Sequence, residues 1–343
     1  MNLGGRKYKK VASAYLLCPV TFFLTQVEME WYVVLLLVVV LLAVLQKWWT
    51  GRFGYCQSQA DMRGKTVIIT GANTGIGKAT ALELARRHAR VILACRNKNK
   101  AEAARDDIIK VTGNTDVIVK EVDMSKLASV RTFAAEICKE EPQLDVLINN
   151  AGMAGPSKKT LTEDGLELTF ATNHFSHFLL TNLLLDLLKK SSPSRIVNVA
   201  SMAHLWGRVD FDNLCAEKWY NEGRAYCDSK LMNILFTREL NKRLAGTGVT
   251  VNALHPGTVR SELFRSTPWF VKVLFERILQ PFLKTPYQGA QCSIYCAVSK
   301  EMAEVSGQYV CDCRIQDPYK PGMDDGAAKK LWEVSERLTG VTS

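Results

Sequence analysis

A glycine-rich turn, TGANTGIG at Thr70–Gly77, most constrains the fold of this 343-residue chain. The apolar run KTVIIT precedes the turn, as a buried strand would, and the helix-like run TALELARRHA follows it. Gly71, Gly75 and Gly77 permit a tight turn and a close approach of the backbone to a pyrophosphate, which then lies at the N-terminus of a helix that begins near Ile76. A purely structural turn is the alternative. In this setting of strand, turn and helix, the pattern predicts a dinucleotide site.

From about Met62 onward, strand-like and helix-like segments alternate. Continuous runs of Val and Ile occur at helix-length intervals in VILAC, VIVKEVD, DVLINN, RIVNVA and GVTVNAL. Such runs are typical of parallel strands that are buried on both faces. We therefore expect an α/β fold with a doubly wound parallel sheet of the Rossmann type. No repeat or linker interrupts the sequence after this point, so residues 62–343 are expected to form one domain.

Residues 1–61 contain a long run of apolar residues. The run WYVVLLLVVVLLAVL at Trp31–Leu45 contains no charge, and Lys47, Trp48 and Trp49 follow closely. As a helix, these 15 residues span about 22 Å, which is short of the ~30 Å hydrocarbon core of a bilayer. The flanking residues extend the segment to 31–49 and would complete a crossing. A helix in the membrane plane is the alternative, and in either case we expect a membrane anchor.

Charges on the two sides of this segment predict its orientation. Glu28 and Glu30 precede it, whereas the residues that follow it are basic, namely Lys47, Arg52, Arg63 and Lys65. The positive-inside rule therefore places the bulk of the chain in the cytosol. A basic cluster and the apolar stretch from Val11 resemble the first two parts of a signal peptide, but no small-residue cleavage site follows. Met29 could serve as an internal start, and the role of residues 1–28 is open.

The cysteine pattern and the net charge limit which kinds of partner the chain is expected to bind. The ten cysteines follow no disulfide framework, which favours a reduced compartment. Cys292 and Cys296 with Cys311 and Cys313 suggest zinc, but no histidine has a matching spacing and the two pairs look like parts of a helix and a strand, so we expect no metal. The net charge of +10 is not concentrated in a basic and aromatic run outside the membrane-proximal segments, so we expect no nucleic acid partner. Anionic membrane lipid is the better partner, and a merely solvated surface is the alternative.

The segment AYCDSK places Tyr226 four residues before Lys230 in a helix-like stretch. Residues four apart share one helix face, so the phenol and the ammonium can project into a common space. A nearby ammonium stabilises a phenolate, which moves the pKa of a tyrosine from about 10 toward that of a useful general acid and base. The same spacing is common on solvated helix faces, so it needs support from other residues.

Six motifs supply that support. In chain order they are TGANTGIG, LINNAG (Leu147–Gly152), ATNHF (Ala171–Phe175), NVASMA (Asn198–Ala203), YCDSK (Tyr226–Lys230) and HPGTV (His255–Val259). With them, residues 64 to about 315 resemble the short-chain dehydrogenase/reductase superfamily. The anchor and the segments ACRN, AYCDSKLMNILF, HPGTVRSEL and KTPYQGAQ narrow the resemblance to the membrane-bound retinol dehydrogenases that prefer NADP. The resemblance implies that residues 62–343 are a catalytic domain on the cytosolic face of the endoplasmic reticulum membrane.

The resemblance also implies a role for each matching residue. Tyr226 is the proton donor and acceptor at the substrate oxygen, and Ser201 hydrogen-bonds that oxygen. Lys230 lowers the pKa of Tyr226 and holds the nicotinamide ribose, while Asn173 completes a relay through a bound water. The implied cofactor-binding residues are Gly71, Asn73, Thr74, Gly75, Ile76, Gly77, Arg96, Asp123, Asn150, Tyr226, Lys230, Pro256, Gly257, Thr258 and Val259.

Plainer alternatives exist for some of these residues. Ser201 could cap the turn after a strand, and Asn173 could be a buried amide in a helix. The neighbouring His174 and His177 are expected to be packing or surface histidines.

Two departures from the superfamily are visible. Ala200 stands where close relatives often have another serine, and Tyr226 follows Ser201 by 25 residues, an interval longer than is common. The membrane-bound retinol dehydrogenases share that insertion.

Charge favours NADP over NAD. In the NAD arrangement an acid ends the second strand and binds the ribose hydroxyls. Here the strand ends in Arg96 and Asn97, with Lys98 following and Lys78 in the glycine turn. A guanidinium at Arg96 can grip a 2′-phosphate, and solvated basic residues are the alternative. The resemblance assigns the adenine contact to Asp123.

The substrate is expected to be a lipophilic small molecule. The segment Pro268–Leu283 is rich in aromatic and aliphatic residues and forms either a lid over an apolar pocket or a core-packing helix. We expect an NADP(H)-dependent oxidoreductase that interconverts an aldehyde and an alcohol, with retinal and retinol suggested by the resemblance. The alternatives are a reductase of steroids or lipid-derived aldehydes and an inactive, cofactor-binding membrane scaffold. The intact Ser201, Tyr226 and Lys230 argue against the scaffold. No oligomeric state is predicted.

Overall fold

The computed structural model describes residues 53–259 and 283–341, with a few further positions between 37 and 51. The chain divides into two units, Met1–Arg52 and Phe53–Ser343.

Residues 53–61, which we expected in the anchor region, belong to the second unit. The Cys56 N–H donates to Gln291 Oε1 at 3.2 Å, and the Arg87 guanidinium donates to the Ser58 carbonyl at 2.6 Å. These contacts tie the segment to the helices of the second unit.

In the first unit, the described apolar residues are helical and exposed; they are Leu37, Val38, Val40, Leu41 and Val44. The rest of the Trp31–Leu45 run lies outside the described residues, as does nearly all of the expected lid, Pro268–Leu283. Among the described residues, no helix is both long and apolar enough to cross a membrane. The anchor and the lid therefore stay predictions.

One eight-stranded sheet forms the centre of the second unit, in the order β3-β2-β1-β4-β5-β6-β7-β8. Six strands coincide with predicted ones: β1 (Thr66–Thr70), β2 (Arg90–Cys95), β3 (Val117–Glu121), β4 (Val146–Asn149), β5 (Ser194–Val199) and β6 (Val249–His255). The strand-like segment around Cys311 forms the short strand β7 (Tyr309–Cys311), whereas β8 (Arg314–Gln316) was not predicted and pairs antiparallel to β7. The doubly wound fold is confirmed, but the sheet is mostly rather than wholly parallel.

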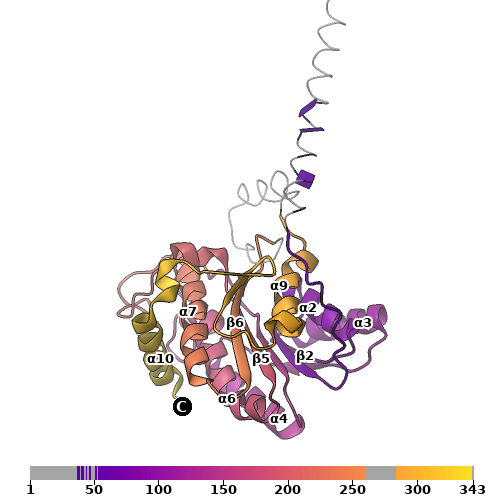
Figure 1. The fold of residues 1–343 in the computed structure, drawn as a ribbon. Coiled ribbons are helices and arrows are strands. Elements are labelled where there is room, and N and C mark those ends of the chain that lie inside the picture. The colour runs from indigo at the N-terminus through magenta and orange to yellow at the C-terminus, as the bar shows by residue number, and fades with distance from the viewer. Residues whose placement is uncertain are drawn as a thin grey trace, which may run out of the picture. The chain divides into compact units, whose positions relative to one another are not determined.

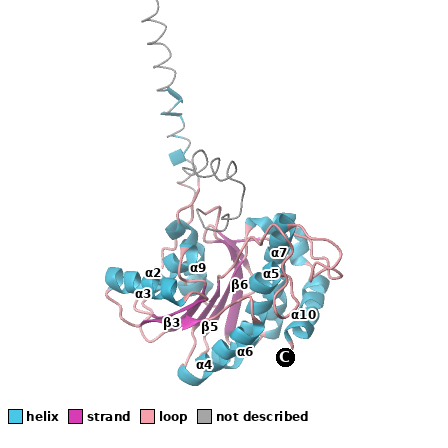
Figure 2. Ribbon diagram, turned by 180° about the vertical axis from the view of Figure 1, so that it is seen from behind, coloured by secondary structure: helices cyan, strands magenta, loops and turns pink. Residues whose placement is uncertain are grey.

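Helices cover both faces of the sheet (Figures 1 and 2). One face carries α2 (Gly75–Arg86), α3 (Lys98–Thr112) and α9 (Pro286–Val298), and the other carries α4 (Leu127–Glu140), α6 (Ser176–Lys190) and α7 (Glu222–Arg243), with α10 (Asp325–Thr339) against α7. The shorter turns are α5 (Leu168–Phe170), η1 (Ala171–Phe175), η2 (Met202–Trp206), η6 (Lys300–Met302) and η7 (Lys320–Met323).

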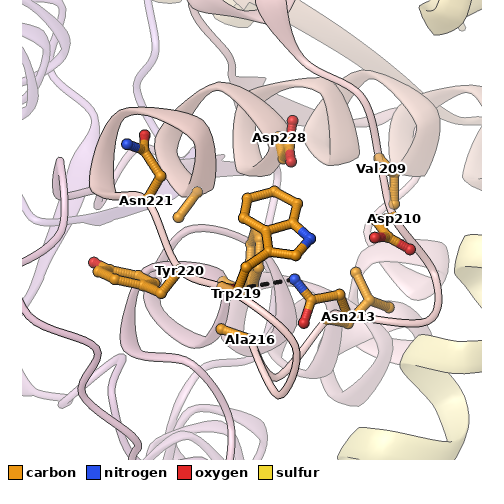
Figure 3. A pocket seen from close by; sticks show the side chains of 11 residues that line it. Val209, Asp210, Asn213, Ala216, Trp219, Tyr220, Asn221 and Asp228 are labelled. Atoms are coloured by element: carbon orange, nitrogen blue, oxygen red, sulfur yellow. Dashed lines mark hydrogen bonds between the residues drawn. The ribbon is translucent and has the colours of Figure 1, made fainter.

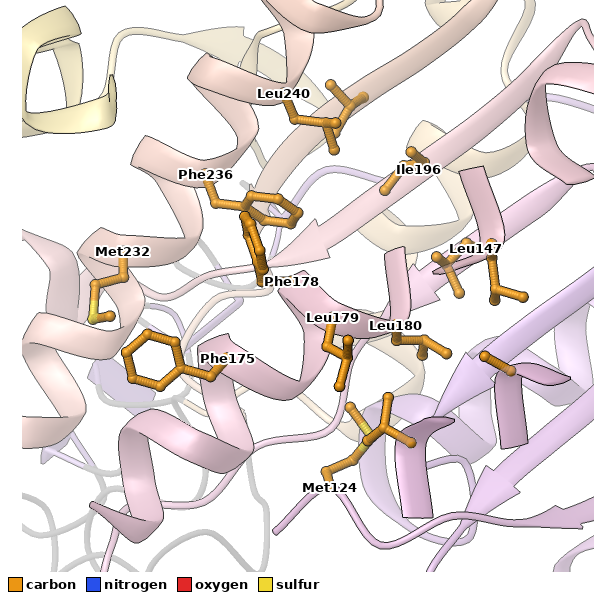
Figure 4. Packing of buried hydrophobic residues seen from close by; sticks show 14 of the residues in the cluster. Met124, Leu147, Phe175, Phe178, Leu179, Leu180, Ile196, Met232, Phe236 and Leu240 are labelled. Atoms are coloured by element: carbon orange, nitrogen blue, oxygen red, sulfur yellow. The ribbon is translucent and has the colours of Figure 1, made fainter. Parts of the chain in front are cut away.

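Side-chain alternation along the strands produces two cores. Ile68 packs into the core beneath α4, α6 and α7, whereas its neighbours Val67 and Ile69 pack into the core beneath α2, α3 and α9. Successive residues of a strand point to opposite faces, so a strand buried on both sides must be apolar throughout. In the first core, Phe178 meets Phe236 of α7 at a ring-centroid distance of 5.5 Å (Figure 4). This packing fixes α7 against α6.

Candidate active site

The expected site residues gather at the carboxyl ends of neighbouring strands. Thr70 ends β1, Asn150 follows β4, Ser201 follows β5 and Pro256 follows β6. The strand order reverses beside β1, where β4 is the next neighbour. In doubly wound sheets, ligands bind at this edge and at this point of reversal.

The glycine turn is tight on its inner side and open on its outer side. Gly71 and Gly75 have φ angles of +66° and +57°, which favour glycine. A Cβ added to Gly77 would lie 2.5 Å from the Gly71 carbonyl oxygen and 2.6 Å from Asn150 Nδ2. A Cβ added to Gly75 would meet no atom within 4 Å. The turn therefore leaves room for a group on the outside.

The first turn of α2 suits an anion. Thr74 precedes the helix and its side chain makes no capping hydrogen bond, and the first turn contains no acidic residue. The N–H groups at a helix N-terminus and the helix dipole attract negative charge. Asn73, Thr74 and Ile76 lie in or beside this turn, as expected. The residues present thus fit the pyrophosphate of a dinucleotide.

Asn150 joins the turn after β4 to the glycine turn. Its side-chain amide donates to the Thr70 carbonyl at 2.8 Å, and its backbone N–H donates to Thr70 Oγ1 at 2.9 Å. The Ala151 N–H donates to the same hydroxyl at 2.9 Å. Asn150 therefore holds the turn after β4 against the start of the glycine turn.

Tyr226 and Lys230 share one face of α7, with Lys230 Nζ 5.6 Å from the centroid of the Tyr226 ring. The Ser201 side chain lies close enough to the Tyr226 phenol to lower the pKa of that phenol, and Ser201 Oγ accepts from the Ala203 N–H at 3.1 Å. Ser201 thus caps η2, as the plainer alternative supposed, and still reaches the tyrosine.

Burial sets the pKa values of the pair. It raises the pKa of Tyr226, and the neighbouring Ser201 hydroxyl opposes this increase. Burial lowers the pKa of Lys230 to about 8. We expected Lys230 to lower the pKa of Tyr226, but its ammonium lies over the ring and donates to the Val199 carbonyl at 3.2 Å. The phenol is neutral near pH 7 and holds a transferable proton.

Asn173 lies in the π-helical turn η1 and is fully buried. Its side-chain oxygen accepts from the Met153 N–H, and its amide donates to the Met153 carbonyl and to Ser229 Oγ, each at 2.9 Å. The amide therefore ties η1 to the segment after β4 and to α7. This is the buried-amide alternative, and the relay role stays a proposal.

His174 and His177 are buried packing residues, as expected. Burial, as the largest cause, lowers the pKa of His174 to about 3 and that of His177 to about 4. His177 Nε2 lies 2.9 Å from Thr70 Oγ1, and its Nδ1 lies 3.2 Å from the Asn173 carbonyl oxygen.

Arg96 follows β2 with 73% of its side chain exposed, 4.0 Å from Asp123 Oδ1. Lys78 instead pairs with Asp107 at 2.6 Å. Asp123 Oδ1 accepts from the backbone N–H and the hydroxyl of Ser125, so the carboxylate shapes the turn after β3. Arg96 is thus an exposed basic side chain at the end of β2.

Lys284 contacts the loop after β6. The sequence did not lead us to expect this residue at the site. A Cβ added to Gly257, whose φ is +90°, would lie 2.6 to 2.8 Å from the Lys284 side chain. The Lys284 N–H donates to the Thr258 carbonyl at 2.9 Å, and Val259 forms a parallel bridge with Lys284. Lys284 is buried and pairs with Asp312 at 2.5 Å. Only its place in KTPYQGAQ hinted at this contact.

A small pocket elsewhere on α7 is not part of this site (Figure 3). Trp219 points toward its centre, the Asn213 amide donates to the Trp219 carbonyl at 3.1 Å, and Ala225 and Asp228 of α7 line it. Helix geometry places Ala225 and Asp228 on the face opposite Tyr226 and Lys230. The pocket therefore does not open toward the reactive pair.

The fold and the site define a dehydrogenase of the short-chain class. A family model described as short chain dehydrogenase matches residues 65–269, and the chain belongs to this family of oxidoreductases.

Its relatives include named retinol dehydrogenases. Retinol dehydrogenase 12 of Bos taurus is 49% identical over 87% of this chain and 92% of its own length. The human retinol dehydrogenases 13 and 14 are each 50% identical, over 84% and 82% of this chain and 88% of their own lengths.

Solved structures show the same fold. A putative uncharacterized protein from Mycobacterium paratuberculosis is 37% identical, with a TM-score of 0.68 over 84% of this chain and 98% of its own. A 7α-hydroxysteroid dehydrogenase complexed with NADH and 7-oxo glycochenodeoxycholic acid is 25% identical, with a TM-score of 0.59 over 73% and 93%.

Proposed function

We propose that this chain is a membrane-attached, NADP(H)-dependent oxidoreductase that interconverts a lipophilic aldehyde and its alcohol, with retinal and retinol as the leading pair. The group formed by half-buried Ser201 and Tyr226 with buried Lys230 supports the reaction type. The names of the relatives at 49–50% identity suggest the retinoid.

The proposed roles follow from the protonation states. A nicotinamide dinucleotide bound along the glycine turn supplies or accepts hydride. Tyr226, which is neutral, donates its proton to the substrate oxygen as charge develops there, and the Ser201 hydroxyl hydrogen-bonds the same oxygen. The adjacent Lys230 ammonium is proposed to hold the nicotinamide ribose. Alcohol oxidation uses the same groups in the opposite sense.

Arg96 supports NADP as the cofactor. Its exposed guanidinium stands at the end of β2, where a 2′-phosphate would be met, and the sequence places no acid directly after that strand. The remaining cofactor contacts are proposed for the glycine turn, Asp123, Asn150 and the loop Pro256–Val259. Asn173 is proposed for the proton relay.

We further propose that the N-terminal region, through its apolar segment 31–49, attaches the chain to membrane lipid, at the endoplasmic reticulum, with the catalytic domain in the cytosol. The charge asymmetry around Trp31–Leu45 supports this orientation. A lipophilic substrate dissolved in the bilayer would then lie close to the enzyme.

A steroid or a lipid-derived carbonyl compound is the second candidate substrate. The solved steroid dehydrogenase with 25% identity favours it, but less strongly than the closer relatives favour a retinoid. The scaffold without activity is disfavoured by the intact reactive group.

A substrate panel tests the function. Detergent-extracted full chain is mixed with NADPH or NADH and with all-trans-retinal, medium-chain aldehydes and ketosteroids, and cofactor oxidation and the products are measured. A Tyr226→Phe protein prepared in parallel controls for contaminating reductases. We expect the fastest turnover with retinal and NADPH. Faster turnover of a ketosteroid would replace the retinoid assignment, and no turnover above the control with any substrate would contradict the oxidoreductase assignment.

A further inference from the structure

His255, the last residue of β6, lies between two parts of the site. Its Nδ1 accepts the Met202 N–H at 3.0 Å and the Gly257 N–H at 3.3 Å. Met202 directly follows Ser201, and Gly257 belongs to the loop proposed to contact the cofactor. One ring nitrogen therefore contacts both segments.

The bond to Met202 begins where the sheet ends. The last backbone bond between β5 and β6 joins the Ala200 N–H to the Leu254 carbonyl at 2.8 Å. Beyond it, two histidine side chains bind the peptide after Ser201, whose carbonyl also accepts the His204 N–H at 3.1 Å. Its N–H is bound by His255, and its carbonyl accepts from His204 Nδ1 at 2.7 Å. Without His255, one side of this peptide loses its support.

The ring is in the state that this contact needs. An imidazole nitrogen that accepts hydrogen bonds is unprotonated, so Nε2 carries the hydrogen. Burial first, and then the Lys284 ammonium and His204, lower the pKa of His255 to about 4, with Asp312 acting in the opposite direction. His255 therefore stays neutral near pH 7 and is unsuited to proton transfer with the substrate.

We propose that His255 is a positioning residue that fixes the Ser201 turn relative to the Pro256–Val259 loop through its Nδ1 atom. The proposal rests on the proposed function, because it takes Ser201 as the substrate contact and this loop as a cofactor contact. Since reacting groups on the two segments must meet within a narrow range of distance, a loose connection lowers the rate even when both ligands bind.

Two substitutions at His255 separate positioning from simple packing. His255→Asn retains an acceptor, Oδ1, attached to the same Cγ position as Nδ1, whereas His255→Leu keeps apolar bulk and removes the acceptor. We expect kcat to fall about 10²-fold in the Leu variant and less than about tenfold in the Asn variant, with smaller changes in the KM for NADPH. Rates are normalised to the folded fraction.

A second readout does not depend on turnover. Amide hydrogen exchange, followed by mass spectrometry on the full chain, reports the peptides that contain Met202 and Gly257. In the Leu variant, exchange should accelerate in both peptides. In the Asn variant, it should accelerate in neither peptide. Ile137→Val in α4, where the side chain is fully buried, provides a control that costs stability without touching either segment.

The outcomes are distinct. Unchanged kcat and exchange in the Leu variant would overturn the proposal, as would an equal loss in the Leu and Asn variants. If the Leu variant does not fold, His255→Gln, which moves the acceptor one bond outward, takes its place, and identical behaviour of Gln and Asn counts against positioning. If the wild-type chain reduces no substrate, the proposed function fails, and the exchange measurements alone decide whether His255 couples the two segments.

Discussion

Tyr226 is the one residue at the site that combines a transferable proton with a neighbouring ammonium. Replacement by Phe retains the ring packing and removes only the hydroxyl, so we expect turnover to fall by at least about 10² while NADPH binding changes little. Steady-state kinetics and NADPH fluorescence titration measure the two effects. The matched control is Tyr295→Phe in α9. It removes a tyrosine hydroxyl that donates a hydrogen bond to Glu301, and it should keep its activity. Retention of activity within tenfold in the Tyr226 variant would assign the proton to another group.

Arg96 is expected to decide between the two dinucleotides. A charge-assisted contact with a 2′-phosphate contributes about 1.5 to 3 kcal/mol, so Arg96→Ala should lower the NADPH to NADH preference roughly ten- to a hundredfold. NADH offers no phosphate to this side chain, so its KM should hardly change. Both KM values are measured at one ionic strength, because such contacts are screened by salt. Lys98→Ala, also an exposed basic residue near the end of β2, is the control. An unaltered preference would remove Arg96 from this role.

At the scale of elements, the junction of β1 with α2 can be tested with a matched pair of glycines. Gly75 and Gly113 have φ angles of +57° and +72°, and a Cβ added at either meets no atom within 4 Å. Alanine at each position should cost about 1–2 kcal/mol of backbone strain and lower the Tm similarly. Only Gly75→Ala places a methyl group at the start of α2, so only this variant should lose NADPH affinity. Equal NADPH affinity in the two variants would show that the cofactor phosphates do not bind at the start of α2.

The long central strands could be predicted because they are buried on both faces and largely apolar, and β3 at the edge begins with the apolar run Val117–Val119. β8 could not, since it has three residues, too few for a periodic pattern, and is wholly exposed. The π-helical turn at Ala171–Phe175 also left no pattern in the sequence. It depends on the contacts of Asn173 with Met153 and Ser229, which are distant along the chain.

The site residues also divide into those that the sequence could predict and those that it could not. The motif spacings predicted that Ser201, Tyr226 and Lys230 would share a site, because strand ends and helix faces follow from local structure. The direction of the Tyr226 pKa was predicted wrongly, since it depends on burial that no spacing reveals. Lys284 and His255 were missed as structural supports because their contacts with the loop after β6 depend on tertiary packing.

At the scale of the whole molecule, the proposed orientation can be tested on intact microsomes. Protease added outside should digest the catalytic domain, because the basic residues after Trp31–Leu45 predict that the chain beyond it faces the cytosol. Immunoblotting follows the loss of the domain, and a lumenal marker protein shows that the vesicles are closed. Complete protection until detergent is added would reverse the orientation.

The buried histidines should make the whole molecule sensitive to acid. Burial lowers the pKa of His174 to about 3 and those of His177 and His255 to about 4. In the unfolded chain each ring titrates near ~6.5, so between roughly pH 6.5 and 4 the unfolded state binds protons that the folded state does not. The folded state keeps its full advantage above pH 6.5 and loses on the order of 1 kcal/mol per pH unit for each histidine as the pH falls.

His174→Phe tests this acid sensitivity. Phenylalanine retains an aromatic ring among Phe175, Phe178 and Phe236 and removes the titrating group, while the contact between His174 Nε2 and Ser335 Oγ, 2.9 Å apart, is lost. The variant should therefore be less stable at pH 7, yet its stability should fall less steeply between pH 6.5 and 4.5. Chemical unfolding at a series of pH values gives the two slopes. Ile137→Val, which lowers stability at a fully buried position without removing a titrating group, is the control and should keep the wild-type slope. Parallel slopes for His174→Phe and wild type would show that His174 does not carry the acid sensitivity.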